Sequence, residues 1–148
     1  MGVLPFKKQA NSTDCRTMKV LVVDDCLTIR ISLSKHLTGW GFEPVLADSV
    51  AAAMQIMNGP DAPRLMIVDW MMPEIEGPVF IEWHRENDKM RNSYIIMLTA
   101  KSGRDVLETA FRCGADDYLT KPVVPDELYR RIREGQNILE RQDAVLKA

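Results

Sequence analysis

Three aspartates of this chain stand directly after apolar runs of the sequence. Asp24 and Asp25 follow the run 20–23, and Asp69 follows the run 65–68. A buried charge is costly unless it is paired or binds a metal ion, so these carboxylates should lie at the mouth of a cleft. At pH 7 all three would be ionised and would repel one another. The pattern therefore indicates a site that also contains positive charge.

Short apolar runs alternate along the chain with segments of helical spacing. A run of four or five β-branched and aliphatic residues without polar alternation is typical of a strand buried on both faces. We expect strands at 20–23, 42–46, 65–68, 94–98 and 118–119, and helices at 27–37, 49–57, 78–86, 104–112 and from 125 onward. Five strands alternating with five helices predict an α/β fold with a parallel sheet.

The polar residues that follow these strands should meet at one edge of such a sheet. Ligands of parallel α/β sheets bind outside the carboxyl ends of the strands. The residues at these ends are Asp24, Asp25, Asp69, Thr99 and Lys121. Carboxylate ligands without histidine or cysteine favour a hard cation, Mg²⁺ or Mn²⁺. Carboxylates, such a cation, a lysine and a hydroxyl are suited to phosphoryl transfer, in which a carboxylate can itself accept the phosphoryl group.

At these positions the sequence resembles the receiver domains of two-component response regulators. The resemblance rests on the acidic pair Asp24-Asp25 and on three further motifs. These are "VDWMMPEIEG" around Asp69, "IIMLTA" ending at Thr99-Ala100, and "GADDYLTKP". The order and spacing of the motifs also agree with the family, and the similarity extends from about residue 18 to about residue 133.

The resemblance implies a fold and a role for each matching residue. The fold would be a flavodoxin-like, doubly wound sheet of five parallel strands in the order 2-1-3-4-5, with five helices, the last of them extended. Asp69 would accept a phosphoryl group from a sensor histidine kinase or a phosphotransfer protein. Lys121 and Thr99 would contact the phosphoryl oxygens, while Thr99 and Tyr118 would switch the surface of the fourth helix, fifth strand and fifth helix. The Lys121–Pro122 peptide would be cis.

The resemblance also implies a metal site. Asp24, Asp25 and Asp69 would hold Mg²⁺ (or Mn²⁺), together with the backbone carbonyl of Met71. Met71 is apolar where many relatives carry a polar residue, and Lys101 lies two residues beyond the threonine. We expect both side chains to flank the phosphoryl group and Met71 to slow its hydrolysis, because a thioether offers no group that orients water.

Two other functions remain open from the sequence. Phosphatases of the haloacid dehalogenase type place a nucleophilic aspartate at the end of the first strand, in a DxDx(T/V) pattern. Residues 24–28 match its first and fifth positions, but Cys26 stands where the acid/base aspartate is needed. The second is a receiver-like binding module that is never phosphorylated, although such modules usually lack at least one site residue. We therefore expect a protein that catalyses only its own phosphorylation and dephosphorylation, and not an enzyme with other substrates.

Composition narrows the setting in which the protein works. The chain has 148 residues, 27% of them charged, with a formal net charge of −2. One domain is expected, and a domain-wide nucleic-acid surface is disfavoured because such domains are usually strongly basic. No apolar run approaches the ~20 residues that cross a bilayer. Cys15, Cys26 and Cys113 form no CxxC pair, which fits a reducing cytoplasm.

The tail raises a question of domain organisation. We expect a flexible lead-in at 1–17, a receiver domain at 18–133 and a helical extension at 134–148. Alternating 4-3 spacing continues through the tail at Leu128, Ile132, Gly135, Leu139, Gln142 and Leu146. This spacing is typical of a coiled-coil seam, which favours a projecting helix that pairs in a homodimer. The alternatives are a homodimer through the switch surface, or an amphipathic helix that packs back onto the domain.

Overall fold

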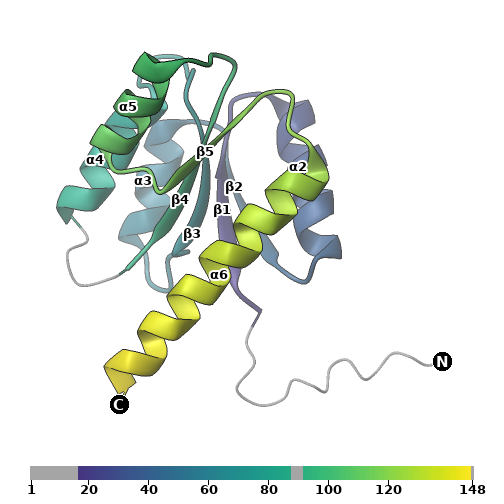
Figure 1. Ribbon diagram of the computed structural model, residues 1–148, viewed down its shortest axis with the longest axis vertical. Helices are drawn as coiled ribbons and strands as arrows, with labels where there is room; N and C mark the ends of the chain where they lie inside the picture. Colours follow the sequence, from purple (N-terminus) through teal and green to yellow (C-terminus); the bar gives the residue numbers. More distant parts are fainter. Residues whose placement is uncertain (1–16, 88–91, 148) are drawn as a thin grey trace.

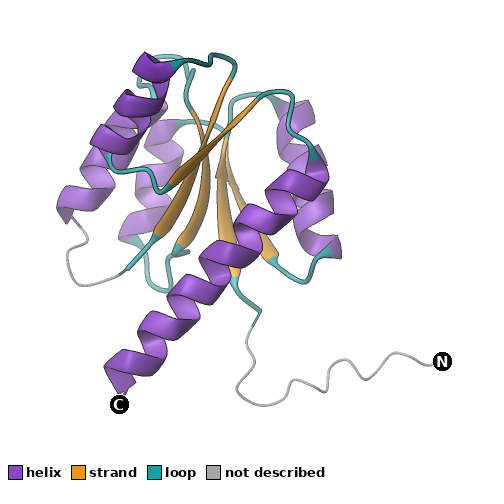
Figure 2. Ribbon diagram, viewed as in Figure 1, coloured by secondary structure: helices purple, strands orange, loops and turns teal. Residues whose placement is uncertain are grey.

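The computed structural model describes residues 17–87 and 92–147, which form one sheet covered on both faces by helices (Figures 1 and 2). The strands are β1 (Lys19–Val23), β2 (Glu43–Ala47), β3 (Leu65–Asp69), β4 (Tyr94–Thr99) and β5 (Asp117–Thr120). The helices are α2 (Leu27–Gly39), α3 (Val50–Asn58), α4 (Gly77–Asn87), α5 (Arg104–Cys113) and α6 (Pro125–Lys147). Of the predicted lead-in, only residue 17 lies within the described residues.

The sheet has the strand order β2-β1-β3-β4-β5, and every pair of neighbours is parallel. The predicted flavodoxin-like, doubly wound sheet of order 2-1-3-4-5 with five helices is therefore confirmed. Because all strands run in the same direction, their carboxyl ends share one edge. The predicted boundaries differ from the observed ones by at most two residues at either end of an element, where strands and helices fray.

The uninterrupted apolar runs are explained by burial on both faces of the sheet. Leu21 and Val23 of β1 pack in a core with α3, α4 and α5. Val20 and Val22 pack on the other face, in a core with α2 and α6. Alternate residues of one strand thus pack into two separate cores, which explains why the run is apolar at every position.

Helix α6 packs back across the sheet (Figure 1). Leu128 and Ile132 are fully buried and Leu139 is 1% exposed, all within the core that α2 shares. A Cβ atom at Gly135 would lie 2.5 Å from Cδ2 of Tyr94, so the glycine lets the helix approach the strand closely. The prediction of a projecting coiled-coil seam is therefore wrong at these positions, because the chain's own sheet occupies the face that a partner helix would need.

The far end of α6 is also anchored. Nη1 of Arg64 donates to both carboxylate oxygens of Asp143 at 3.0 Å, and its Nε donates to the carbonyl of Asn92 at 2.7 Å. The side chain of Leu146 lies outside the described residues.

Among helices formed by residues 17–87 and 92–147, none is long and apolar enough to cross a membrane.

Candidate functional site

The two adjacent aspartates after β1 have different environments. Asp24 is 1% exposed, and its backbone N–H donates to the carbonyl of Ala47 at 3.1 Å. Its carboxylate accepts the N–H of Cys26 at 2.9 Å, and its carbonyl accepts from Arg30 at 2.7 Å. Asp25 is exposed. One carboxylate is thus fixed inside the edge of the sheet, and the other faces outward at its mouth.

Asp69 is the last residue of β3 and is 4% exposed. The turn that follows is fixed by two backbone hydrogen bonds, from Trp70 to the carbonyl of Leu98 at 2.8 Å and from Gly77 to the carbonyl of Trp70 at 3.0 Å. A Cβ atom at Gly77 would lie 2.2 Å from the carbonyl oxygen of Asp69. Only glycine fits there, so the start of α4 presses directly on the backbone of Asp69.

Lys121 brings a positive charge to these carboxylates. Its Nζ lies 2.8 Å from Oδ1 of Asp69 and 3.4 Å from Oδ2 of Asp24. Its backbone N–H donates to the carbonyl of Thr99 at 2.8 Å, which continues the pairing of β5 with β4. The Lys121–Pro122 peptide is cis, as the resemblance implied.

The charges of the site do not balance. Burial raises the pKa of the Asp69 carboxyl, and the negative charges of Asp24 and Asp25 add to this, so the hydrogen bond from Lys121 does not cancel the rise. Burial alone would lower the pKa of Lys121, but its hydrogen bond to Asp69 and the nearby carboxylate charges leave that pKa above its ordinary value. Three carboxylates therefore share one ammonium group, and a further cation would relieve the remaining repulsion.

The three carboxylates can reach a single ion. Asp24, Asp25 and Asp69 each offer an oxygen, and these oxygens all lie within 4.8 Å of one another. A donor set of oxygens alone fits Mg²⁺ or Mn²⁺. Met71, whose carbonyl is the fourth expected ligand, lies two residues after Asp69 and is 51% exposed.

Thr99 lies at the same edge, and Tyr118 lies farther back in the sheet. Thr99 ends β4, is 1% exposed, and its hydroxyl oxygen accepts the N–H of Lys101 at 2.9 Å. Tyr118 lies in β5 opposite Met97, half-buried against the core of α3, α4 and α5. Trp70, the residue after Asp69, is half-buried against that core. The predicted site residues at the strand ends thus lie at one edge of the sheet: Asp24, Asp25, Asp69, Thr99 and Lys121.

Two supporting residues escaped the sequence reasoning. Arg30, in the first turn of α2, holds the backbone of Asp24, and nothing in its sequence position distinguishes it from a surface arginine. The role of Gly77 could have been predicted, because a glycine directly before Pro78 is typical of a tight turn between a strand-end aspartate and the next helix.

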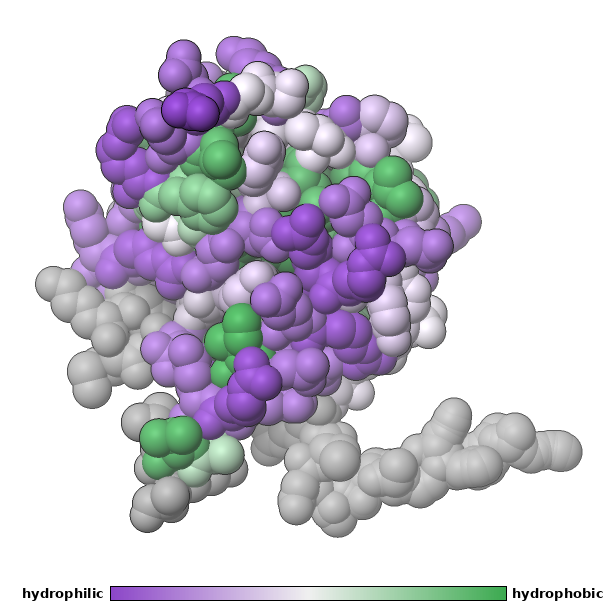
Figure 3. Space-filling model, viewed as in Figure 1, coloured by the Kyte–Doolittle hydropathy of each residue, from purple (hydrophilic) through white to green (hydrophobic). Residues whose placement is uncertain are grey.

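An apolar groove of about 430 Å³ lies beside the site, between α2 and the β5–α6 connection. The groove is lined by Ile29, Ser32, Leu33, Lys121, Pro122 and Val123. Figure 3 shows apolar side chains interrupting the hydrophilic surface over this connection, where Val124 is 55% exposed. Lys121 therefore borders both the carboxylates and a surface that could receive another protein.

Residues 20–133 match the family described as "Response regulator receiver domain". The chain is 36% identical over 115 residues to the phosphate regulon transcriptional regulatory protein PhoB of Escherichia coli K12. That similarity covers 78% of this chain and 50% of PhoB, so the chain spans about half the length of this curated relative.

Two further similarities cover nearly whole proteins. The chain is 32% identical over 118 residues to a chemotaxis protein CheY homologue of Campylobacter jejuni, covering 79% of this chain and 91% of that protein. The crystal structure of a putative response regulator from Chloroflexus aurantiacus is similar with a TM-score of 0.75 and 32% identity, over 80% of this chain and 97% of the other.

Proposed function

Because this chain belongs to the response-regulator receiver family, a family of signalling modules, we propose that Asp69 accepts a phosphoryl group from a phosphohistidine. The observation that carries the proposal is the buried Asp69 carboxylate, 2.8 Å from the ammonium of Lys121 and beside the acidic pair Asp24-Asp25. The donor would be a sensor histidine kinase or a phosphotransfer protein.

The proposed reaction is a phosphoryl transfer to a carboxylate. An oxygen of Asp69 attacks phosphorus as the P–N bond of phosphohistidine breaks, and the departing imidazole takes up a proton, which leaves an acyl phosphate. Lys121 balances charge on the phosphoryl oxygens, and the hydroxyl of Thr99 donates to one of them. A bound Mg²⁺, held by Asp24, Asp25 and Asp69 with the carbonyl of Met71, would supply the positive charge that the carboxylates lack.

The proposed output is a change in the surface of α5, β5 and α6. Thr99 would turn toward the phosphoryl group, and the half-buried Tyr118 would follow into the space released. A homodimer through this surface is a further prediction, which sedimentation of the chain with and without phosphorylation tests.

The apolar groove beside Lys121 is the surface that we assign to the phosphodonor. Helix α2 lines one side of it with Ile29, Ser32 and Leu33. The same helix also exposes Leu27 and Ile31, at 61% and 46%. A charged substitution in the groove at the exposed Ser32, Ser32→Glu, should slow transfer from a cognate donor while leaving phosphorylation by acetyl phosphate unchanged.

Intact-mass spectrometry after incubation with acetyl phosphate and Mg²⁺ tests the chemistry. We expect one phosphoryl group on the wild-type chain and none on Asp69→Asn, which removes the nucleophile with little change in volume. Persistence of the group in that variant would overturn the assignment. Steady phosphate release that depends on Asp24 would instead support the phosphatase alternative, whereas the proposal limits catalysis to the chain's own acyl phosphate.

A further inference from the structure

Strand β5 leads directly into Lys121 and is weakly supported by the sheet. It has four residues, lies at the edge and pairs only with β4 in the described part of the chain. Tyr118 lies within it, and Lys121 follows it directly. A shift of an edge strand moves every side chain that it carries. The position of the Lys121 ammonium therefore depends on what holds the two ends of β5.

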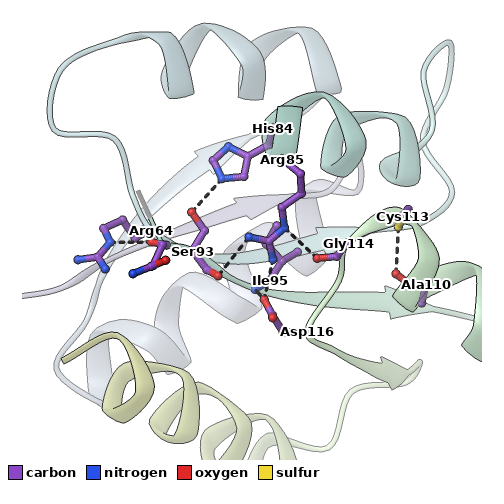
Figure 4. A network of polar contacts seen from close by, with 10 residues as sticks. Arg64, His84, Arg85, Ser93, Ile95, Ala110, Cys113, Gly114 and Asp116 are labelled. Carbon is purple, nitrogen blue, oxygen red and sulfur yellow. Dashed lines mark hydrogen bonds and ion pairs between the residues drawn. The ribbon is translucent and has the colours of Figure 1, made fainter. Parts of the chain in front are cut away.

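The end of β5 next to the site is held by the backbone bond from Lys121 to Thr99. The other end is held through Asp116. Its backbone N–H donates to the carbonyl of Ile95 at 2.9 Å, and its Oδ2 accepts the N–H of Ile95 at 2.8 Å. The same oxygen accepts from Nη2 of Arg85 at 2.8 Å. One carboxylate oxygen thus joins β4, the start of β5 and a side chain of α4 (Figure 4).

Arg85 joins α4 to the residue before β4 and to the turn between α5 and β5 (Figure 4). Besides Asp116, its guanidinium donates to the carbonyl of Gly114 at 2.9 Å and to that of Ser93 at 3.3 Å. A Cβ atom at Gly114, which has a φ of +117°, would lie 2.8 Å from Cγ of Arg85. The stem of the arginine therefore fills the space above the turn between α5 and β5, and its planar donor set fixes that turn from several directions.

Helix α4, which carries Arg85, also contacts the phosphoacceptor. Its first residue, Gly77, presses on the backbone of Asp69, and Arg85 lies near its other end. A single helix thus touches the strand that bears the carboxylate and the turn that leads into the strand before Lys121.

From these contacts we propose that Arg85 is a positioning residue for phosphoryl transfer. It fixes the entry of β5 and thereby places the ammonium of Lys121 against Asp69. This inference rests on the proposed function. A misplacement of about 1 Å can cost up to about 100-fold in rate, and β5 keeps its bonds to β4 without the arginine. We therefore expect Arg85→Met to slow phosphorylation by acetyl phosphate about tenfold.

The experiment compares initial phosphorylation rates, by intact mass, of the wild type, Arg85→Met, Arg85→Lys and Arg64→Met. Arg64 is the matched control, because it also joins a carbonyl to a carboxylate but anchors the tail of α6. Its variant should stay within about twofold of the wild type, since it leaves β5 intact. Arg85→Lys keeps the charge without the fork of donors and should restore part of the rate. Equal slowing in both methionine variants would show general destabilisation and overturn the proposal.

Two readouts separate positioning from a merely structural role. In a Lys121→Met background, Arg85→Met should change the rate by less than about twofold, because residues that act as a unit are not additive. Amide hydrogen exchange should become faster at residues 117–121 in Arg85→Met and not in Arg64→Met. Unchanged exchange there, or a full tenfold effect without Lys121, would overturn the inference. A wild-type chain that takes up no phosphoryl group would instead overturn the proposed function, and the exchange result would still decide whether Arg85 anchors β5.

Discussion

Leu139→Ala tests whether the second half of α6 belongs to the folded domain. Leu139 is 1% exposed in the core between the sheet, α2 and α6. Large-to-small changes of this kind cost about 2–5 kcal/mol, more where the surroundings cannot collapse into the cavity. Here the helix is held on both sides, by the close approach of Gly135 to Tyr94 and by the ion pair of Asp143. We therefore expect a loss of about 3 kcal/mol in the free energy of unfolding.

Urea unfolding, followed by tryptophan fluorescence, measures this loss, with the midpoint lowered and the slope unchanged. Val145→Ala is the control on the same helix. Val145 is 73% exposed, so its truncation should change the free energy of unfolding by no more than about 0.5 kcal/mol. A Leu139→Ala variant as stable as Val145→Ala would refute the packing argument and would favour the prediction of a projecting helix.

Three further outcomes are expected. Asp25→Asn should raise the Mg²⁺ concentration for half-saturation by at least about tenfold, because losing even an outer-shell partner lowers metal affinity about 10–100-fold. Trp70 fluorescence measures this midpoint, and an unchanged midpoint would count against the metal site. Met71→Asn should speed decay of the acyl phosphate severalfold in a mass-spectrometric time course, and equal or slower decay would contradict the role given to the methionine. At pH 8, Cys113 should resist alkylation while the exposed Cys26 reacts, because burial raises the pKa of the Cys113 thiol and leaves little thiolate. Peptide mapping measures the labelling, and equal labelling of the two cysteines would show that the end of α5 opens readily.

Much of the fold was predictable because the relevant signals are local. Apolar runs that end in Asp24, Asp69 and Thr99 mark strands and their direction, and a parallel sheet then brings those ends together. This topology predicts the grouping of the strand-end residues Asp24, Asp25, Asp69, Thr99 and Lys121 despite their long separations in sequence. Met71 and Tyr118 were predicted only from the family resemblance.

The interior of the tail was not predictable in the same way. A 4-3 spacing of apolar residues indicates that a helix has one buried face, but it does not indicate which part of the protein, or which partner, covers that face. Gly135 was the available signal, since a glycine weakens a coiled coil yet permits a close crossing over a strand. The role of Arg85 was hidden for a different reason: its partners, Gly114 and Asp116, lie about 30 residues away and belong to another turn.

The course of α6 has a practical use for fusion and labelling. The helix starts four residues after Lys121, and its far part is tied to Arg64, directly before β3 begins. Its 23 residues span roughly 34 Å at 1.5 Å per residue. A fluorophore or an affinity tag attached after residue 147 would therefore sit at the amino edge of the sheet. Such a probe should report the binding of partner proteins while leaving the approach to Asp69 open.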